Sequence, residues 1–186
     1  MSLPHAILTA LLEKPSSGLE LTRRFDKSIR YFWSATHQQI YRELGRLEQA
    51  GLIRELPQQL PSQGQRKEYE VLPAGRAELA AWVARPEDPK PLRDALLLRL
   101  RAAALVGPQG LAAELHRHRA LHQQALDEYL TIERRDFTAD RTTEADRLQH
   151  LVLRAGISLE TNWIAWLDEA ATELGPPEPF TADPHR

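Results

Sequence analysis

Apolar residues recur at helical spacing along most of the chain and alternate with polar residues in two short stretches. The clearest helical pattern covers residues 34–50, where an apolar stripe lies opposite a polar side. The stripe consists of Ile40, Leu44 and Leu47. This spacing predicts an amphipathic helix that ends before Gly51, since glycine favours the left-handed conformation found at helix ends. Ser34 is the expected N-cap because its hydroxyl can accept hydrogen bonds from open backbone amides.

Two shorter helices are predicted before this one. The first covers residues 2–13, and the second opens at Gly18 after the turn-forming sequence K-P-S-S-G. The expected core side chains are Leu3, Ile7, Ala10 and Leu11 in the first helix and Leu21, Phe25 and Ile29 in the second. The aromatic residues at 31–33 are interpreted as core packing, because large rings mostly supply buried area.

The two alternating stretches, residues 52–56 and 66–72, predict the strands of a β-hairpin. The connection P-Q-Q-L-P-S-Q-G-Q between them is polar and too long for a tight turn. By itself it fits a plain exposed loop or a DNA-contacting wing equally well, and the preceding amphipathic helix favours the wing. A further helix that carries Trp82 is expected to start at Pro73, because proline is favoured at the first helical position.

The second half of the chain is predicted to be helical after a linker. Three prolines between residues 85 and 91 forbid a continuous helix and indicate a stiff connection. Beyond them, one helix is expected to stop at Gly107, a long one to cover about 108–135, and a last one to cover 144–174. The long helix has a thin, partly polar stripe, which favours packing against a partner over a place deep in a core.

Composition narrows the classes of function. The chain has 186 residues, of which 42% are hydrophobic and 27% charged, an ordinary balance for a globular protein. It contains no cysteine, which excludes disulfides and thiolate metal sites. No apolar run approaches the roughly 20 residues of a membrane span, and the start M-S-L-P-H-A-I-L is not expected to be a secretory signal. We therefore expect a cytoplasmic protein that does not bind membranes.

The charge is unevenly distributed. The formal net charge is −2. Residues 1–85 carry 12 Lys and Arg against 9 Asp and Glu, whereas residues 86–186 carry 12 against 17. The positive first part is typical of a surface that faces DNA, and the negative second part fits contacts with protein.

The polar side of the helix at 34–50 has the chemistry of a DNA-reading surface. Its first turn lacks carboxylates, and glutamine and arginine can hydrogen-bond base edges or phosphates. A helix of this kind enters the major groove by its amino end, although an ordinary solvated helix is also polar outside. The candidates for base contacts are Thr36, His37, Gln38 and Tyr41. The candidates for phosphate contacts are Arg23, Arg24, Arg42, Arg46, Arg66 and Lys67.

The sequence Q-Q-I-Y-R-E-L-G-R-L-E-Q-A-G-L-I, followed by R-K-E-Y-E-V-L-P-A-G-R, resembles the winged helix-turn-helix of the PadR family of transcriptional regulators. The resemblance is strong over residues 1–85 and continues more weakly through the later helices. It implies a homodimeric, sequence-specific repressor that binds a palindromic operator in double-stranded DNA. It also implies release by a small-molecule effector, which could be aromatic or hydrophobic.

The expected fold is therefore mainly α with a small β-hairpin wing, an α+β arrangement. We predict a winged helix-turn-helix domain at 1–85, a proline-rich linker at 86–91 and an antiparallel helical dimerisation and effector region at 92–174. The proline-rich tail at 175–186 is expected to be disordered.

The last predicted helix has a broader apolar face than one neighbouring helix covers, and I-S-L-E-T-N-W-I-A-W-L resembles the dimerisation helix of the family. The expected interface residues are Leu148, Val152, Gly156, Leu159, Trp163 and Trp166. Trp163 and Trp166 fit core packing, which tryptophan mostly serves, or a flat wall for a planar effector.

Two alternatives to a DNA-binding regulator stay open. One is a winged-helix module that binds only protein, and the other is a metal-responsive sensor built on His116, His118 and His122. Histidines four residues apart can face one ion, but no third ligand stands at a characteristic spacing, so no metal or other cofactor is expected. The motifs of common hydrolases and nucleotide-binding enzymes are absent from the sequence, and we expect no enzyme.

Overall fold

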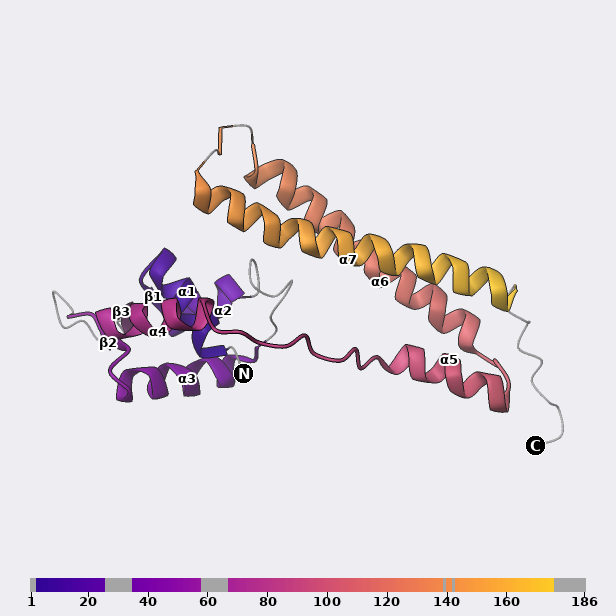
Figure 1. Cartoon of the computed structure of the whole chain (residues 1–186), viewed down its shortest axis with the longest axis horizontal. Helices are drawn as coiled ribbons and strands as arrows, with labels where there is room; N and C mark the ends of the chain where they lie inside the picture. Colours follow the sequence, from indigo (N-terminus) through magenta and orange to yellow (C-terminus); the bar gives the residue numbers. More distant parts are fainter. Residues whose placement is uncertain (1–2, 26–34, 58–66, 139, 142, 176–186) are drawn as a thin grey trace. The chain divides into compact units, whose positions relative to one another are not determined.

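The structure, a computed structural model, describes residues 3–25, 35–57, 67–138, 140, 141 and 143–175. The chain divides into two compact units, residues 1–89 and 90–186 (Figure 1). The fold is mainly helical with one small antiparallel sheet, which confirms the predicted fold class. Among the described residues, no helix combines the length and the apolar character needed to cross a lipid bilayer.

The first unit is a helical core with a small sheet at its edge. Its elements are α1 (Leu3–Glu13), β1 (Ser16–Ser17), α2 (Gly18–Arg24), α3 (His37–Gln49), β2 (Ile53–Glu55), β3 (Glu68–Val71) and α4 (Pro73–Val83). The predicted stripe of α3 is buried in one cluster with side chains of α1, α2 and β2. This cluster comprises Ile7, Leu8, Ala10, Leu11, Leu21, Phe25, Ile40, Leu44, Leu47 and Ile53. The predicted aromatic packing at 31–33 and the core position Ile29 lie outside the described residues.

The sheet has three strands in the order β1-β3-β2, with both pairs antiparallel. The sequence predicts only two strands and a plain turn at K-P-S-S-G, and this prediction is wrong. Ser16 and Ser17 are buried and pair with Tyr69 and Glu68 of β3. A strand of two residues is too short to carry an alternating pattern, so only its pairing partner identifies it.

Gly75 of α4 lets the helix approach the hairpin closely. A Cβ at this position would collide with the carbonyl oxygen of Leu52 and lie 2.9 Å from a methyl carbon of Val71. The same carbonyl accepts a hydrogen bond of 2.9 Å from the amide of Leu72, so it is not free to move away. The absence of a side chain at Gly75 therefore allows α4 to lie close to the start of β2.

The second unit consists of three helices, α5 (Ala95–Val106), α6 (Leu111–Asp136) and α7 (Glu144–Leu174). The bounds of α7 match the predicted helix at 144–174, and α5 ends before Gly107 as expected. The long α6 packs along α7 of the same chain. A buried cluster joins α5, α6 and α7, and its members are Leu96, Leu111, Leu115, Leu167 and Ala170.

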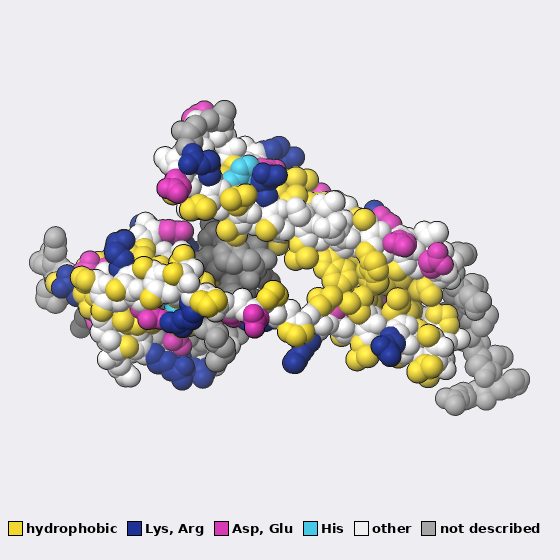
Figure 2. Space-filling view, viewed as in Figure 1, with side chains coloured by type: hydrophobic (Ala, Val, Ile, Leu, Met, Phe, Trp, Pro, Cys, Tyr) yellow, Lys and Arg dark blue, Asp and Glu magenta, His cyan; other side chains and the backbone are white. Residues whose placement is uncertain are grey.

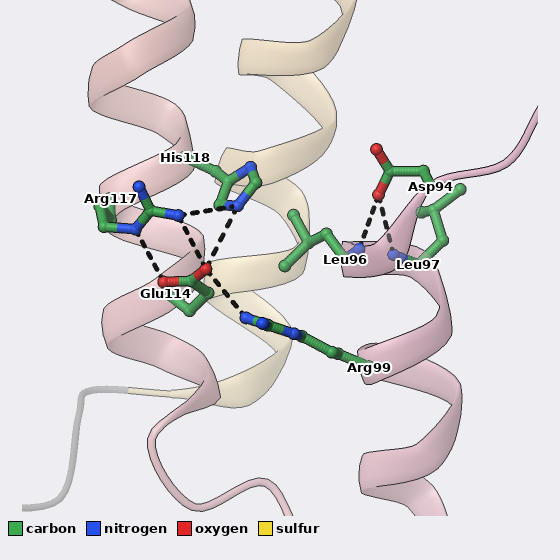
Figure 3. A network of polar contacts seen from close by, with 7 residues as sticks. All are labelled: Asp94, Leu96, Leu97, Arg99, Glu114, Arg117 and His118. Carbon is green, nitrogen blue, oxygen red and sulfur yellow. Dashed lines mark hydrogen bonds and ion pairs between the residues drawn. The ribbon is translucent and has the colours of Figure 1, made fainter.

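Polar contacts fix α5 to α6 at the start of the second unit (Figure 3). Asp94 caps α5 by accepting hydrogen bonds from the amides of Leu96 and Leu97 at 2.7 and 3.2 Å. Glu114 of α6 accepts from Arg99 of α5 at 2.9 Å and from Arg117 at 2.8 and 2.9 Å. One carboxylate thus ties the two helices together.

The same contacts set the protonation of Glu114. Hydrogen bonds from Arg117 lower the pKa of this carboxyl from its ordinary value of 4.5 to about 2. Partial desolvation opposes the change, and the charges of Arg117, Arg99 and His118 lower the pKa further. The carboxylate stays ionised at any pH where the protein is expected to work.

Gly75→Ala should destabilise the fold by about 1–3 kcal/mol, because the added methyl group meets a fixed backbone oxygen. Gly45→Ala is the matched control, since a Cβ there meets nothing within 4 Å. In the interior of α3 this change should stabilise by about 0.5–1 kcal/mol, owing to the better helix propensity of alanine. Urea unfolding followed by circular dichroism measures both, and equal effects of the two variants would contradict the packing described.

Glu114→Gln should lower stability at neutral pH and lose this effect in acid. Because folding lowers the pKa of Glu114, its contribution is present above about 4.5 and disappears as the pH falls towards about 2. Unfolding free energies of the wild type and variant should therefore converge over this range. Glu173→Gln, which removes an exposed carboxylate of α7, is the control and should show no such convergence.

Candidate DNA-binding site

The N-cap of α3 is Thr36, and the prediction that Ser34 caps this helix is wrong. The Thr36 hydroxyl accepts from the amide of Gln39 at 3.2 Å, while the Gln39 side chain accepts from the amide of Thr36 at 2.8 Å. This reciprocal capping box satisfies two open donors at the start of α3. Of the four candidates for base contacts, Thr36 therefore has a structural task in its own helix.

The other candidates lie on the exposed side of the first two turns of α3. His37, Gln38 and Tyr41 are exposed, and no acidic residue stands in the first turn. Arg42 and Arg46 continue the same exposed side, and Figure 2 shows Lys and Arg side chains gathered over α3. The positive end of the helix dipole adds to this potential.

The two arginines of α3 differ in their contacts. Arg46 pairs with Glu43 at 3.4 Å. Arg42 makes no hydrogen bond or ion pair within the described part of the chain. An exposed arginine without an internal carboxylate partner is available to bind an anion, so Arg42 is the better phosphate candidate.

Tyr41 has a second role that the sequence does not indicate. Its ring lies against the backbone of Gly18 at the start of α2, where a Cβ would come within 2.5 Å of the ring. The side chain is nevertheless 53% exposed. Tyr41 thus packs closely against α2 at Gly18 and leaves about half of its surface accessible.

Arg24 is used inside the first unit. Its guanidinium donates to the carbonyl oxygens of Ala10 and Lys14 at 2.8 and 3.1 Å, and to Glu13 at 2.7 Å. Both carbonyls lie at the end of α1, where that of Ala10 also accepts from the amide of Lys14 at 3.2 Å, so Arg24 caps that helix. Arg23 is exposed on α2.

The base of the hairpin carries two further cations. Lys67 lies 2.7 Å from Glu55, and Arg54 lies 2.6 Å from Glu70 on the neighbouring strand. The hydrogen bond to Glu55, and then the charge of Glu55, raise the pKa of Lys67, which keeps the ammonium charged. Arg54 is exposed and was not among the predicted candidates, because a single arginine in a short strand has no distinctive spacing. Arg66 and most of the predicted wing lie outside the described residues.

The predicted dimerisation residues of α7 divide into two groups. Leu148, Val152 and Leu159 are 58%, 47% and 56% exposed. Gly156 instead allows a close contact inside the chain, since a Cβ there would lie 3.1 Å from the ring of Tyr129 on α6. The expected close approach at Gly156 is present, but its partner is α6 of the same chain.

The two tryptophans of α7 also contact their own chain. Trp163 stacks on His122 of α6, with ring centroids 5.4 Å apart and an interplanar angle of 8°. Trp166 meets Trp163 edge to face at 5.4 Å and packs against the buried cluster of the second unit. These contacts favour the packing interpretation over an open aromatic wall.

The three histidines of α6 have separate surroundings. His116 is exposed, His118 lies 3.3 Å from Glu114, and His122 lies 2.5 Å from Glu160. Within the described residues, no three His, Cys, Asp or Glu side chains are arranged to hold a metal ion. The geometry gives the metal-sensor alternative no support.

Comparisons with known proteins cover nearly the whole chain. The family model described as "Transcriptional regulator PadR-like family" matches residues 7–81, and "Virulence activator alpha C-term" matches residues 92–175. The "Probable transcriptional regulator Rv1176c" of Mycobacterium tuberculosis is 42% identical over 185 residues, which cover 94% of this chain and 98% of that protein. The "Negative transcriptional regulator PadR" of Bacillus subtilis is 28% identical over 171 residues, which cover 89% and 93%.

Solved structures agree with this result. The virulence activator AphA of Vibrio cholerae superimposes with a TM-score of 0.77 at 30% identity, over 93% of this chain and 98% of that one. Bacillus subtilis PadR in complex with operator DNA gives a TM-score of 0.80 at 24% identity, over 94% and 100%. The second likeness concerns the fold alone.

Proposed function

The chain belongs to the PadR-like family of transcriptional regulators, and we propose that it is a homodimeric repressor that binds a palindromic operator through α3. The observation that carries this proposal is the exposed side of α3. It begins with His37 and Gln38, has no carboxylate in its first turn and includes the unpaired Arg42. Bacillus subtilis PadR, whose fold this chain shares, has been solved in complex with operator DNA, which supports operator DNA as the partner to test.

In the proposed complex, His37, Gln38 and Tyr41 contact base edges in the major groove. Arg23, Arg42 and Arg46 contact phosphates, and Lys67 does so from the base of the hairpin. Arg66 stays a phosphate candidate on the sequence alone. Thr36 acts by capping α3, and we leave Arg24 out of the contact set because its guanidinium caps α1. Because the dimer has two-fold symmetry, the two half-sites of the operator are separated by a whole number of helical turns, each of roughly 10 base pairs.

We further propose that the dimer forms through the exposed apolar side of α7. Leu148, Leu151, Val152 and Leu159 are each about half exposed or more. Large exposed apolar patches mark interaction surfaces. Gly156, Trp163 and Trp166 are left out of this surface because they contact α6 of the same chain.

An effector bound to the second unit is proposed to release the operator. A structure of Bacillus subtilis PadR contains p-coumaric acid, which supports a small aromatic effector as the class to test. Such a ligand must bind two dimer states with different affinity, since equal affinity shifts no population. We propose no catalytic activity, and a repressor of this kind would act in the cytoplasm, where the operator lies.

Selection of genomic fragments with the purified protein at about 0.1 M salt tests operator binding directly. The expected result is an enriched palindrome. The alternative, a winged-helix module that binds only protein, predicts that no sequence is enriched and that binding stays weak at low salt.

The double variant Arg42→Ala/Lys67→Ala should weaken binding to the selected operator and reduce the slope of log K against log salt by about 2, because two phosphate contacts are lost. Arg101→Ala removes an exposed arginine of α5 and should leave both affinity and slope unchanged. Fluorescence anisotropy over a salt series measures the slopes. Equal slopes for the double variant and the wild type would exclude these two residues as phosphate contacts.

Leu159→Lys should weaken the dimer by about 100-fold or more, because it places an unpaired charge in an apolar interface. The matched control is Thr161→Lys, which adds the same charge at an exposed position on another side of α7. Sedimentation equilibrium gives the dissociation constants, and circular dichroism checks that both variants keep their helices. A dimer undisturbed by Leu159→Lys would place the interface elsewhere.

A further inference from the structure

The α6–α7 pair is an antiparallel seam with polar layers inside it. Three hydrogen-bonded pairs join the helices: Arg119 with Asp168, His122 with Glu160, and Glu133 with His150. The residue numbers rise along α6 while those of the partners on α7 decrease, so the two helices are antiparallel. The core positions of each helix recur every seven residues, as in a coiled coil. They are Leu115, His122 and Tyr129 on α6, and Leu153, Glu160 and Leu167 on α7. All are buried except His122, whose side chain is 23% exposed.

The middle layer of this seam consists of a histidine and a carboxylate. His122 Nδ1 lies 2.5 Å from Glu160 Oε2, and Glu160 is only 9% exposed. The layer on one side contains Leu115 and Leu167 in a single buried cluster. A carboxylate at an otherwise apolar core position is costly unless a partner satisfies it, so the seam depends on His122.

A second histidine–glutamate pair joins α6 and α7, with the histidine on α7 and the glutamate on α6. His150 of α7 lies 2.6 Å from Glu133 of α6. Its ring stacks on Phe137, with centroids 4.7 Å apart and an interplanar angle of 16°. Both pairs are therefore built from one histidine and one glutamate, with the histidine on α6 in one and on α7 in the other.

The charges around both histidines are as follows. On α7, His122 faces Glu160 and Trp163. On α6, the ring centroids of His118 and His122 are 6.4 Å apart. Arg119, also on α6, is paired with Asp168. Glu114 and Arg117 lie beyond His118. His150 faces Glu133, and Arg141 lies over the Phe137 ring at 5.5 Å and pairs with Asp146 at 2.8 Å. For each histidine a carboxylate lies at hydrogen-bond distance.

We propose that the pairs His122–Glu160 and His150–Glu133 make the α6–α7 seam a proton-sensitive lock that tightens when the histidines take up protons. A neutral imidazole can donate one hydrogen bond to the carboxylate. A protonated imidazole donates the same bond with a full positive charge, and charge-assisted hydrogen bonds are about twice as strong as neutral ones. Stacking on Phe137 adds to the effect at His150, because a cation over an aromatic face is attracted.

The direction in which pH changes the stability of the seam follows from these contacts. A hydrogen bond that the protonated histidine makes more strongly adds stability at low pH, and this contribution is lost as the pH rises. The repulsion from His118 and Arg119 is weaker because those groups are farther away and have carboxylate partners of their own. We expect the seam to open more often at about pH 8 than at about pH 6.

Hydrogen–deuterium exchange on the full chain tests this lock without any DNA, so its outcome is independent of the proposed operator binding. Exchange is measured at about pH 6 and about pH 8, corrected for intrinsic rates and at one protein concentration. The amides of α6 and α7 in the wild type should exchange about fivefold more slowly at the lower pH. The double variant His122→Gln/His150→Gln should lose this difference, because glutamine can donate but cannot be protonated.

His116→Gln is the matched control, since it makes the same substitution on α6 at an exposed position, and it should keep the wild-type pH dependence. If the double variant fails to fold, Glu160→Gln and Glu133→Gln remove the carboxylate charges instead and should likewise abolish the difference. Exchange of α6 and α7 that depends on pH equally in the wild type and in the variants at these pairs would overturn the proposal.

Discussion

Burial of one side of α3 is the constraint on which the first unit depends. Ile40, Leu44 and Leu47 are inserted into a core that α1 and α2 also supply, and their burial fixes the rotation of α3 about its axis. The opposite side, which includes His37, Gln38 and Arg42, is exposed as a result. The surface proposed to contact DNA is thus a consequence of apolar packing behind it.

Several residues that were predicted to bind DNA, an effector or a second subunit instead make contacts within their own chain. Thr36 and Arg24 close the ends of helices, where open backbone groups need partners. Trp163 stacks on a histidine of α6, and Gly156 accommodates Tyr129. In each case the residue type was consistent with two roles, and the neighbouring element decided between them.

The second unit relies on a different balance. Its long helices share only a narrow apolar seam, so hydrogen bonds and ion pairs such as Arg119 with Asp168 contribute to holding them in register. A buried polar pair stabilises less than apolar packing would, but it specifies which positions face each other. Such a seam responds to changes in charge more readily than a continuous apolar core.

The sequence by itself determined the helices, the hairpin, the apolar side of α3 and the family, because helical periodicity and local motifs depend on neighbouring residues. It correctly bounded α7 at 144–174 and placed the end of α5 before Gly107. It could not identify β1, whose two residues carry no period. The contact of Tyr41 with Gly18, the capping of α1 by Arg24 and the layer of His122 and Glu160 join residues 10 to 38 positions apart. Only the tertiary structure decided these, because no local pattern states which distant backbone or side chain will lie opposite.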